Sequence, residues 1–203
     1  MDTVTQSQPA IGQAYRGGFF CGRTRIHGDL YNLILAPKAE GEHKSAIWIP
    51  AYKNVPGAKS YDDGVANTKA MAEAGSKLAK WALELRIGGF DDWYLPSQDE
   101  LEHAYRHLKP TADENWCYAR SGINLSSEIP CRPYMPDFPA QTLVEAFREG
   151  GEQAFDAAWY WTSTQHAASS YYAWSQDFTG GNQTYGTKGR ELRACAFRRE
   201  LAI

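Results

Sequence analysis

The most regular hydrophobic pattern in the chain lies between residues 62 and 85 and predicts one amphipathic helix. Its apolar positions recur three, four and seven residues apart on one stripe: Met71, Ala74, Leu78, Trp81, Ala82 and Leu85. Asp62 and Asp63 stand at the predicted start, where the helix dipole favours negative charge. Gly88 and Gly89 provide the stop.

A second helix is predicted from Ser97 to about Leu108. Ser97 and Glu100 have the spacing of a capping box, in which the side chain of each residue accepts a hydrogen bond from the backbone amide of the other. The buried face of this helix is expected to carry Leu101, Ala104, Tyr105 and Leu108. On the same helical wheel His103 and His107 point to the opposite side, so we expect both histidines to face solvent.

Runs rich in aromatic and β-branched residues predict strands on both sides of these helices. They are residues 15–22, 29–37, 46–50, 158–164, 171–178 and 192–198. His27-Gly28-Asp29 predicts a hairpin turn, and Pro50 suggests that the third strand lies at an edge. The predicted fold class is therefore α+β, with two or three helices and an irregular antiparallel β-meander.

Two further segments lie between the predicted helices and the late strands. Residues 109–138 show no sustained period and carry several aromatic side chains, so we expect a long loop that packs on the body and serves a function. Residues 140–148 predict a third helix through Leu143, Val144 and Phe147.

The composition fits one domain with an unusual set of apolar residues. The 203 residues include 7 Trp, 12 Tyr and 8 Phe beside 18 Gly, which suits a turn-dense protein with an aromatic contact surface. With 21 basic and 24 acidic side chains the net charge is −3, which excludes the electrostatic footprint of a general nucleic-acid binder. We expect an N-terminal arm or attachment segment over residues 1–13 and one domain over residues 14–203.

The sequence offers few residues for catalysis or metal binding. It contains no hydrolase, nucleotide-binding or metalloprotease motif, so we expect no catalytic residue, no cofactor and no enzyme activity. Cys21, Cys117, Cys131 and Cys195 are widely spaced and are expected to be buried small hydrophobes. A zinc site of His103 and His107 with Cys117 and Cys131 is the alternative, which the helical wheel disfavours, so no metal is expected.

Several segments together resemble a known family. Gly89-Phe-Asp-Asp-Trp-Tyr-Leu-Pro-Ser-Gln-Asp-Glu-Leu101 resembles the signature G-x-x-D-W-R-L-P-T/S-x-x-E-L. Trp159-Tyr-Trp-Thr-Ser-Thr164, Ala173-Trp174 and Arg193-Ala-Cys-Ala-Phe-Arg198 resemble its closing segments. The chain is thus similar to the DUF1566 (Lcl C-terminal) family, found in bacterial surface proteins and phage tail regions. The Gly-Gly-Glu-Gln-Ala-Phe segment before Trp159 resembles members from Mu-like phages.

The resemblance implies a C-type lectin-like fold and assigns a structural role to the signature residues. These are Trp93, Leu95, Pro96, Ser97, Glu100, Trp159, Trp161, Trp174 and Arg198. Formylglycine-generating oxidases share a related scaffold, but they use a pair of reactive cysteines near the C-terminus, where this chain has Cys195 alone. The sequence triplets of calcium-dependent lectins are also missing from the chain.

Residues 165–190 are the candidate recognition surface because Tyr, Ser, Asn and Gly are typical of adaptable binding loops. The candidate receptor-binding residues are His166, Tyr171, Tyr172, Asn182, Gln183, Tyr185 and Lys188. An ordinary polar meander with turn glycines remains the alternative for this segment.

The function expected from the resemblance is that of a non-enzymatic phage virion protein. We expect a tail-fibre tip or baseplate subunit that binds a glycan or protein receptor on the host, forms a homo-oligomer (a trimer by analogy) and contacts other virion tail proteins. Neither a secretory signal peptide nor an apolar run for a membrane span is evident, so synthesis in the host cytoplasm is expected, without membrane insertion or nucleic-acid binding. A purely structural tail subunit, a bacterial surface-glycan-binding protein and an enzyme acting on cell-envelope glycan remain alternatives.

Overall fold

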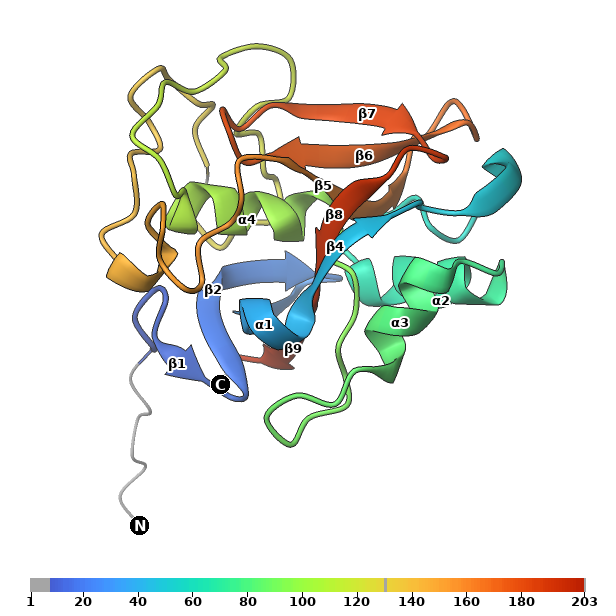
Figure 1. The fold of residues 1–203 in the computed structure, drawn as a ribbon, viewed down its shortest axis with the longest axis horizontal. Helices are drawn as coiled ribbons and strands as arrows, with labels where there is room; N and C mark the ends of the chain where they lie inside the picture. Colours follow the sequence, from blue (N-terminus) through green and yellow to red (C-terminus); the bar gives the residue numbers. More distant parts are fainter. Residues whose placement is uncertain (1–7, 130, 203) are drawn as a thin grey trace.

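The computed structural model describes residues 8–129 and 131–202, which form two β-sheets with helices between and beside them (Figure 1). The first sheet is antiparallel and has the order β1-β2-β3-β9. Its strands are β1 (Ala14–Tyr15), β2 (Gly18–Ile26), β3 (Asp29–Leu35) and β9 (Phe197–Leu201). The hairpin expected at His27 and Gly28 connects β2 to β3. The α+β class is confirmed.

The second sheet has five strands in the order β4-β8-β5-β6-β7. Its strands are β4 (Glu42–Ala46), β5 (Trp159–Gln165), β6 (Tyr172–Asp177), β7 (Gln183–Thr187) and β8 (Leu192–Cys195). Its pairs are antiparallel except β5 with β8, which are parallel. β4 and β7 form the edges, so β7 presents one free backbone side along the outside of the molecule (Figure 1).

The helices cover these sheets. They are α1 (Lys38–Gly41), α2 (Gly64–Glu73), α3 (Lys77–Glu84) and α4 (Gln98–Leu108), with short 3₁₀ turns η1 (Pro50–Tyr52) and η2 (Glu145–Phe147). α4 lies between the two sheets and packs against β2 on one side and β5 and β6 on the other (Figure 1). Leu101, Ala104 and Leu108 of α4 are fully buried in the largest core cluster. No helix in the described residues is long and apolar enough to span a membrane.

The single helix expected over residues 62–85 is in fact two helices. Gly75 adopts a positive φ of 103°, which ends α2, and the Ser76 side chain then accepts a hydrogen bond from the Ala79 amide to begin α3. Asp63 caps α2 by accepting from the Ala66 amide. The apolar stripe is continuous across the break because both helices bury it in one cluster with Trp48.

Three other boundaries differ from the sequence-based expectations. Residues 140–148 contain only the η2 turn because the backbone there bonds to the preceding loop, as when the Thr142 amide donates to the Lys109 carbonyl. The strand expected at 46–50 lies earlier, as β4, while Trp48 turns into the core. The expected last strand divides at Ala196 into β8 and β9, so one segment contributes to both sheets.

The long loop and the N-terminal segment both pack on the body. In the loop, Tyr134 is buried in the main core, and Thr24 of β2 forms an isolated bridge with Ser127. Of the arm expected over residues 1–13, residues 1–7 lie outside the described part. Residues 8–13 are docked, because the Gly12 amide donates to the Phe20 carbonyl and Ile11 packs on the core.

Candidate functional site

The β6–β7 hairpin gathers aromatic side chains on one face of the edge of the sheet. Trp174 pairs with Tyr185 across the two strands, and Tyr172 pairs with Thr187 two positions further along. Because side chains alternate between the two faces of a strand, Tyr172, Trp174 and Tyr185 project from the same face. His166, directly after β5, joins them: its ring centroid lies 4.5 Å from that of Tyr185.

We call His166, Tyr172, Trp174 and Tyr185 the aromatic patch. Tyr185 is at its centre, with centroid distances of 5.2 Å to Tyr172 and 5.6 Å to Trp174. Tyr185 is 45% exposed and the other three are partly exposed. None of the four belongs to a hydrophobic core cluster of the described residues. These rings therefore form a surface feature rather than an extension of the core.

Two polar atoms of the aromatic patch are covered but unpaired. His166 Nδ1 and Trp174 Nε1 are inaccessible to solvent and have no hydrogen-bond partner among the described residues. Trp174 also contacts Tyr61, whose ring carries the Arg120 guanidinium at 4.5 Å. A buried polar atom without a partner carries a cost in free energy.

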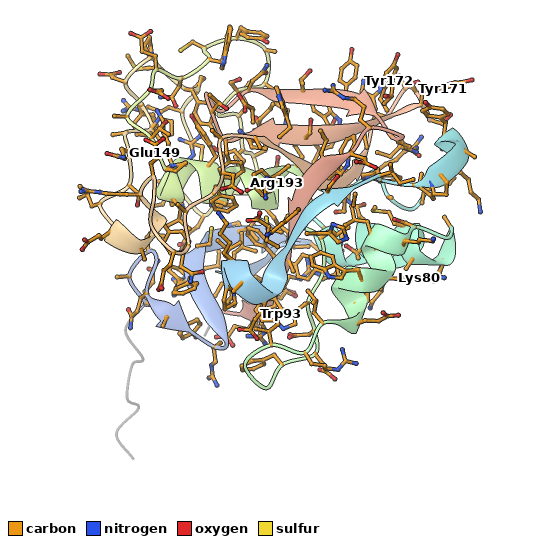
Figure 2. All side chains as sticks on the ribbon, viewed as in Figure 1. Lys80, Trp93, Glu149, Tyr171, Tyr172 and Arg193 are labelled. Carbon is orange, nitrogen blue, oxygen red and sulfur yellow. The ribbon has the colours of Figure 1, made fainter. Side chains whose placement is uncertain are left out.

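A second pair of rings lies beside the start of β6. Tyr171 is 59% exposed, and its ring centroid lies 5.4 Å from that of Tyr52 in η1. Figure 2 shows Tyr171 and Tyr172 at one corner of the molecule, well separated from Trp93 in the body. The backbone links this corner to β7, because the Lys188 amide donates to the Tyr171 carbonyl.

A third pair of rings lies at the turn of the hairpin and comes from the long loop. Trp116 and Tyr118 are both exposed and pack edge to face with centroids 5.7 Å apart. The Trp116 amide donates to the Gly180 carbonyl over 2.8 Å. A Cβ on Gly180 would lie 2.4 Å from the Trp116 ring, so this approach requires glycine. The long loop and the candidate recognition segment, residues 165–190, thus meet in space.

Comparison with known families identifies the scaffold that carries these rings. The profile described as the Lcl C-terminal domain matches residues 43–198. The chain belongs to the Lcl C-terminal domain family. None of the curated proteins compared with the chain matches it.

Among solved structures, the chain is similar to a fimbrial protein from Bacteroides ovatus ATCC 8483. The two share 11% sequence identity at a TM-score of 0.42, over 82% of this chain and 35% of that protein. The chain therefore spans about a third of the length of that structure. A similarity this low carries no argument about function.

The signature residues of this Lcl C-terminal domain lie mostly in its interior. Trp93, Leu95 and Trp161 are fully buried in core clusters. The buried Pro96 presents its carbonyl to the amide and hydroxyl of Ser163, which ties the motif to β5. Trp159 and Trp174 differ, because both are partly exposed. Trp174 belongs to the aromatic patch as well as to the signature.

The expected capping box at Ser97 is present and extends beyond α4. The Glu100 carboxylate accepts hydrogen bonds from the amides of Ser97 and Gly64 and from the Tyr94 hydroxyl. Complete burial raises the pKa of Glu100 to about 7. One carboxylate thus connects the starts of α2 and α4, a structural duty that fits its place in the signature.

Arg198 is the remaining signature residue, and it connects β9 to the signature segment that contains Asp92. Its guanidinium forms two hydrogen bonds with the Asp92 carboxylate, at 2.7 and 3.0 Å, and stacks over the Phe90 ring at 3.9 Å. A bidentate arginine–carboxylate pair fixes geometry as well as charge. The two ends of the family signature, at Asp92 and Arg198, are therefore joined directly.

Two of the nominated receptor-binding residues do not lie on the surface. Gln183 is buried, and Lys188 has 0% exposure beneath the hairpin. The Lys188 ammonium donates to Gln165 and to the Lys53 carbonyl and lies 4.4 Å from the Trp48 ring centroid. Burial lowers its pKa to about 8. The expectation that Gln183 and Lys188 face solvent is wrong: Gln183 is buried at 2% exposure, and Lys188, directly after β7, packs on Trp48 and Gln165 inside the fold.

Asn182 is placed differently from both. It is partly exposed at the turn of the hairpin, and its amide donates to the Tyr118 hydroxyl. Trp116 and Tyr118 were not nominated, although the aromatic content of residues 109–138 was the signal that could have found them.

The histidines of α4 also differ from expectation. His103 is buried at 1% exposure and His107 is mostly buried, because β2 and the long loop cover the face of α4 that the helical wheel assigned to solvent. Of the cysteines expected to be buried, Cys21 and Cys195 are, whereas Cys117 is exposed and Cys131 partly exposed. Within the described ranges, no three His, Cys, Asp or Glu side chains are grouped to hold a metal ion.

Proposed function

We propose that this Lcl C-terminal domain is a non-enzymatic binding module that recognises a cell-surface glycan through its aromatic patch. The observation that carries the proposal is the cluster around Tyr185, where four rings gather on an exposed sheet edge outside the described core clusters. Tyrosine and tryptophan supply large, rigid contact area at low entropic cost. Their flat apolar faces suit sugar rings, and their polar ends suit sugar hydroxyls.

The arrangement of the rings favours an extended ligand. Trp116 and Tyr118 stand at the turn of the hairpin, the aromatic patch follows along β6 and β7, and Tyr171 with Tyr52 stands beyond the start of β6. A short glycan chain could contact several of these rings, each contact adding affinity. A single sugar would contact only one of these three groups of rings.

A second candidate function is subunit contact within a larger assembly. It is favoured by the position of β7, whose outer edge has no strand partner in the described sheet. Such an edge is a template for pairing with another chain. In that case the aromatic patch would be covered in the assembled particle and would bind no receptor.

We place the module in a phage tail-fibre tip or baseplate, built on a C-type lectin-like scaffold and assembled as a homotrimer. The support is the resemblance of residues 150–155 to Mu-like phage members of the family. Mass spectrometry of purified virions tests this setting, and light scattering of the purified chain tests the trimer. Recovery of the protein from a bacterial envelope instead of from virions would favour a surface-glycan-binding protein.

The binding experiment compares the full chain with Tyr185→Ala and Tyr171→Ala on a glycan array and on host cells. Leu143→Ala is the control, because it removes an 88% exposed apolar side chain outside the patch. We expect the Tyr185 change to weaken binding by about tenfold or more, with an unchanged melting temperature, as for a central contact residue. Equal binding by wild type and Tyr185→Ala would refute the aromatic patch as the receptor site.

A further inference from the structure

A cavity of about 410 Å³ lies away from the aromatic patch, between α4, β2 and residues 127–129 and 131–138. This volume is in the range of small-molecule sites. Its floor is formed by His103 and His107 of α4 together with Gly22, and its rim carries Ile129, Arg132 and Phe138. The proposed glycan recognition makes no use of these residues.

The floor of the cavity is shaped by an irregularity in β2. The pairing of β2 with β3 shifts register between Phe20 and Gly22, which leaves the Cys21 carbonyl free to accept a hydrogen bond from His107 Nδ1 over 2.7 Å. Gly22 has a φ of 136°, and a Cβ there would lie 3.0 Å from His103 Nδ1. The glycine thus allows both imidazoles to approach the strand.

His103 is the unsatisfied group of this floor. It is almost completely buried, and neither ring nitrogen has a hydrogen-bond partner among the described residues. Burial, together with the neighbouring His107 and Arg106, holds its pKa well below the usual range. The ring is therefore neutral and offers one donor and one acceptor. Leaving both unpaired costs free energy that a bound polar group would recover.

The rim supplies positive charge and an apolar wall. The Arg132 guanidinium lies 3.8 Å from the Phe138 ring centroid and forms no ion pair within the described residues. Arg106 is paired with Glu102 at 2.8 Å, and Arg23 lies 3.6 Å from Glu128. Arg132 is thus the exposed cation at this rim whose charge is uncompensated. Ile129 adds an apolar surface beside it.

We propose that this cavity binds a small organic carboxylate with an apolar body and a hydroxyl or carbonyl group at its far end. The carboxylate pairs with Arg132, the body packs on Phe138 and Ile129, and the polar end reaches His103. A divalent metal on His103 and His107 is the competing occupant. The uncompensated charge of Arg132 repels a cation, and no third ligand joins the histidines in the described part of the chain.

The test uses three matched probes with the full chain: 4-hydroxyphenylacetate, phenylacetate, which lacks the hydroxyl, and 4-hydroxyphenylacetamide, which lacks the charge. Calorimetry measures affinity, and nitrogen-15 spectra of the histidine rings report on His103. We expect 4-hydroxyphenylacetate to bind with the highest affinity of the three and to shift the ring nitrogens of His103. The uncharged amide should bind at least about tenfold more weakly, a difference of about 1.4 kcal/mol.

Arg132→Gln tests the rim without disturbing the fold, because this side chain is exposed. We expect it to weaken 4-hydroxyphenylacetate binding by about tenfold, while Arg86→Gln, an exposed arginine outside the cavity, leaves it unchanged. The proposal is overturned if none of the three probes binds at millimolar concentration. It is equally overturned if binding is insensitive to Arg132→Gln, or if Zn²⁺ alone shifts both histidine rings and the carboxylates do not.

Discussion

The side-chain amide of Asn182 donates a hydrogen bond to the hydroxyl of Tyr118 over 2.8 Å, across 64 positions of the chain. Asn182 lies at the turn between β6 and β7, and Tyr118 lies in the long loop that follows α4. With the backbone bond from Trp116 to Gly180, this contact holds the loop against the hairpin. The exposed Trp116 and Tyr118 rings are thereby held against the turn of the hairpin and form one local surface with it.

We expect Asn182→Ala to loosen this surface without unfolding the domain. A partly exposed hydrogen bond between neutral groups contributes about 0.5–1.5 kcal/mol. Hydrogen exchange at the Trp116 amide should therefore accelerate, while exchange in α4 stays unchanged. Tyr118→Phe removes the same bond from the other side, so the double variant should be no less stable than the worse single variant. Additive losses would show that the two residues act independently.

Glu100 should make the stability of the domain fall as the pH rises from about 4.3 towards 7. Its pKa is raised to about 7 in the folded chain by burial, whereas the unfolded value is about 4.3. The folded state therefore holds the extra proton in this window, and ionisation on raising the pH costs stability. Glu100→Gln should weaken this dependence in urea unfolding measured across the window. Equal pH slopes for the two proteins would contradict the assignment.

Glu100→Ala should be far more damaging than Glu100→Gln. It leaves the amides of Ser97 and Gly64 and the Tyr94 hydroxyl without their acceptor inside the protein. Each unpaired buried group costs about 1–3 kcal/mol, so we expect a loss of about 3 kcal/mol or more. Urea unfolding at pH 6 measures the difference. A loss below about 1 kcal/mol would show that the carboxylate does not hold the two helix starts together.

Lys188 should make the stability of the domain rise with pH above about 8, which is opposite to the effect of Glu100. Burial lowers its pKa to about 8 in the folded chain, compared with about 10.4 when unfolded. The folded state therefore holds fewer protons between these values, and stability from this group rises as the pH increases through the window. The stability of wild type relative to Lys188→Met should increase from pH 8 to 10. The comparison isolates Lys188 because all other titrating groups are shared.

The sequence predicted the parts of the fold that depend on local chemistry. The capping box at Ser97 and the hairpin turn at His27 are determined by neighbouring residues, and both are present. Gly75 was a sign in the sequence that the helix could end there, but the continuous apolar stripe favoured a single helix. Periodicity measures which face is apolar and does not show where the backbone changes direction.

The candidate sites were harder to predict because they depend on packing between distant segments. A helical wheel placed His103 opposite the apolar face, yet α4 lies between two layers and has no fully solvated side. Lys188 was a candidate because it lies in the turn-rich segment 165–190, but its ammonium packs on Trp48 and bonds to Gln165 in the interior. Tyr171 and Tyr185 were located correctly as exposed rings, because turn-rich segments at a sheet edge leave large side chains outside.

The pair of Arg198 and Asp92 predicts how the family signature stabilises the fold. Arg198→Lys keeps the charge but loses the second hydrogen bond and the stacking on Phe90. We expect a loss of about 1–2 kcal/mol in urea unfolding, because the arginine is buried while the aspartate is half exposed. Arg190→Lys, at an exposed position, is the control. Equal stability of the Arg198→Lys and Arg190→Lys variants would show that the pair of Arg198 and Asp92 does not stabilise the fold.

Gly22 should be intolerant of any side chain, for two independent reasons. Its φ of 136° lies in a region that L-residues rarely adopt, and a Cβ would lie 3.0 Å from both His103 and His107. Each backbone position of this kind costs about 1–3 kcal/mol for a non-glycine residue. Gly22→Ala should therefore destabilise the domain by at least that amount and displace the imidazoles. Gly28→Ala is the matched control, because Gly28 also has a positive φ but nothing near its Cβ position. A loss of stability for Gly22→Ala no greater than for Gly28→Ala would show that the histidine rings can move aside at no cost. The register shift in β2 would then not determine their positions.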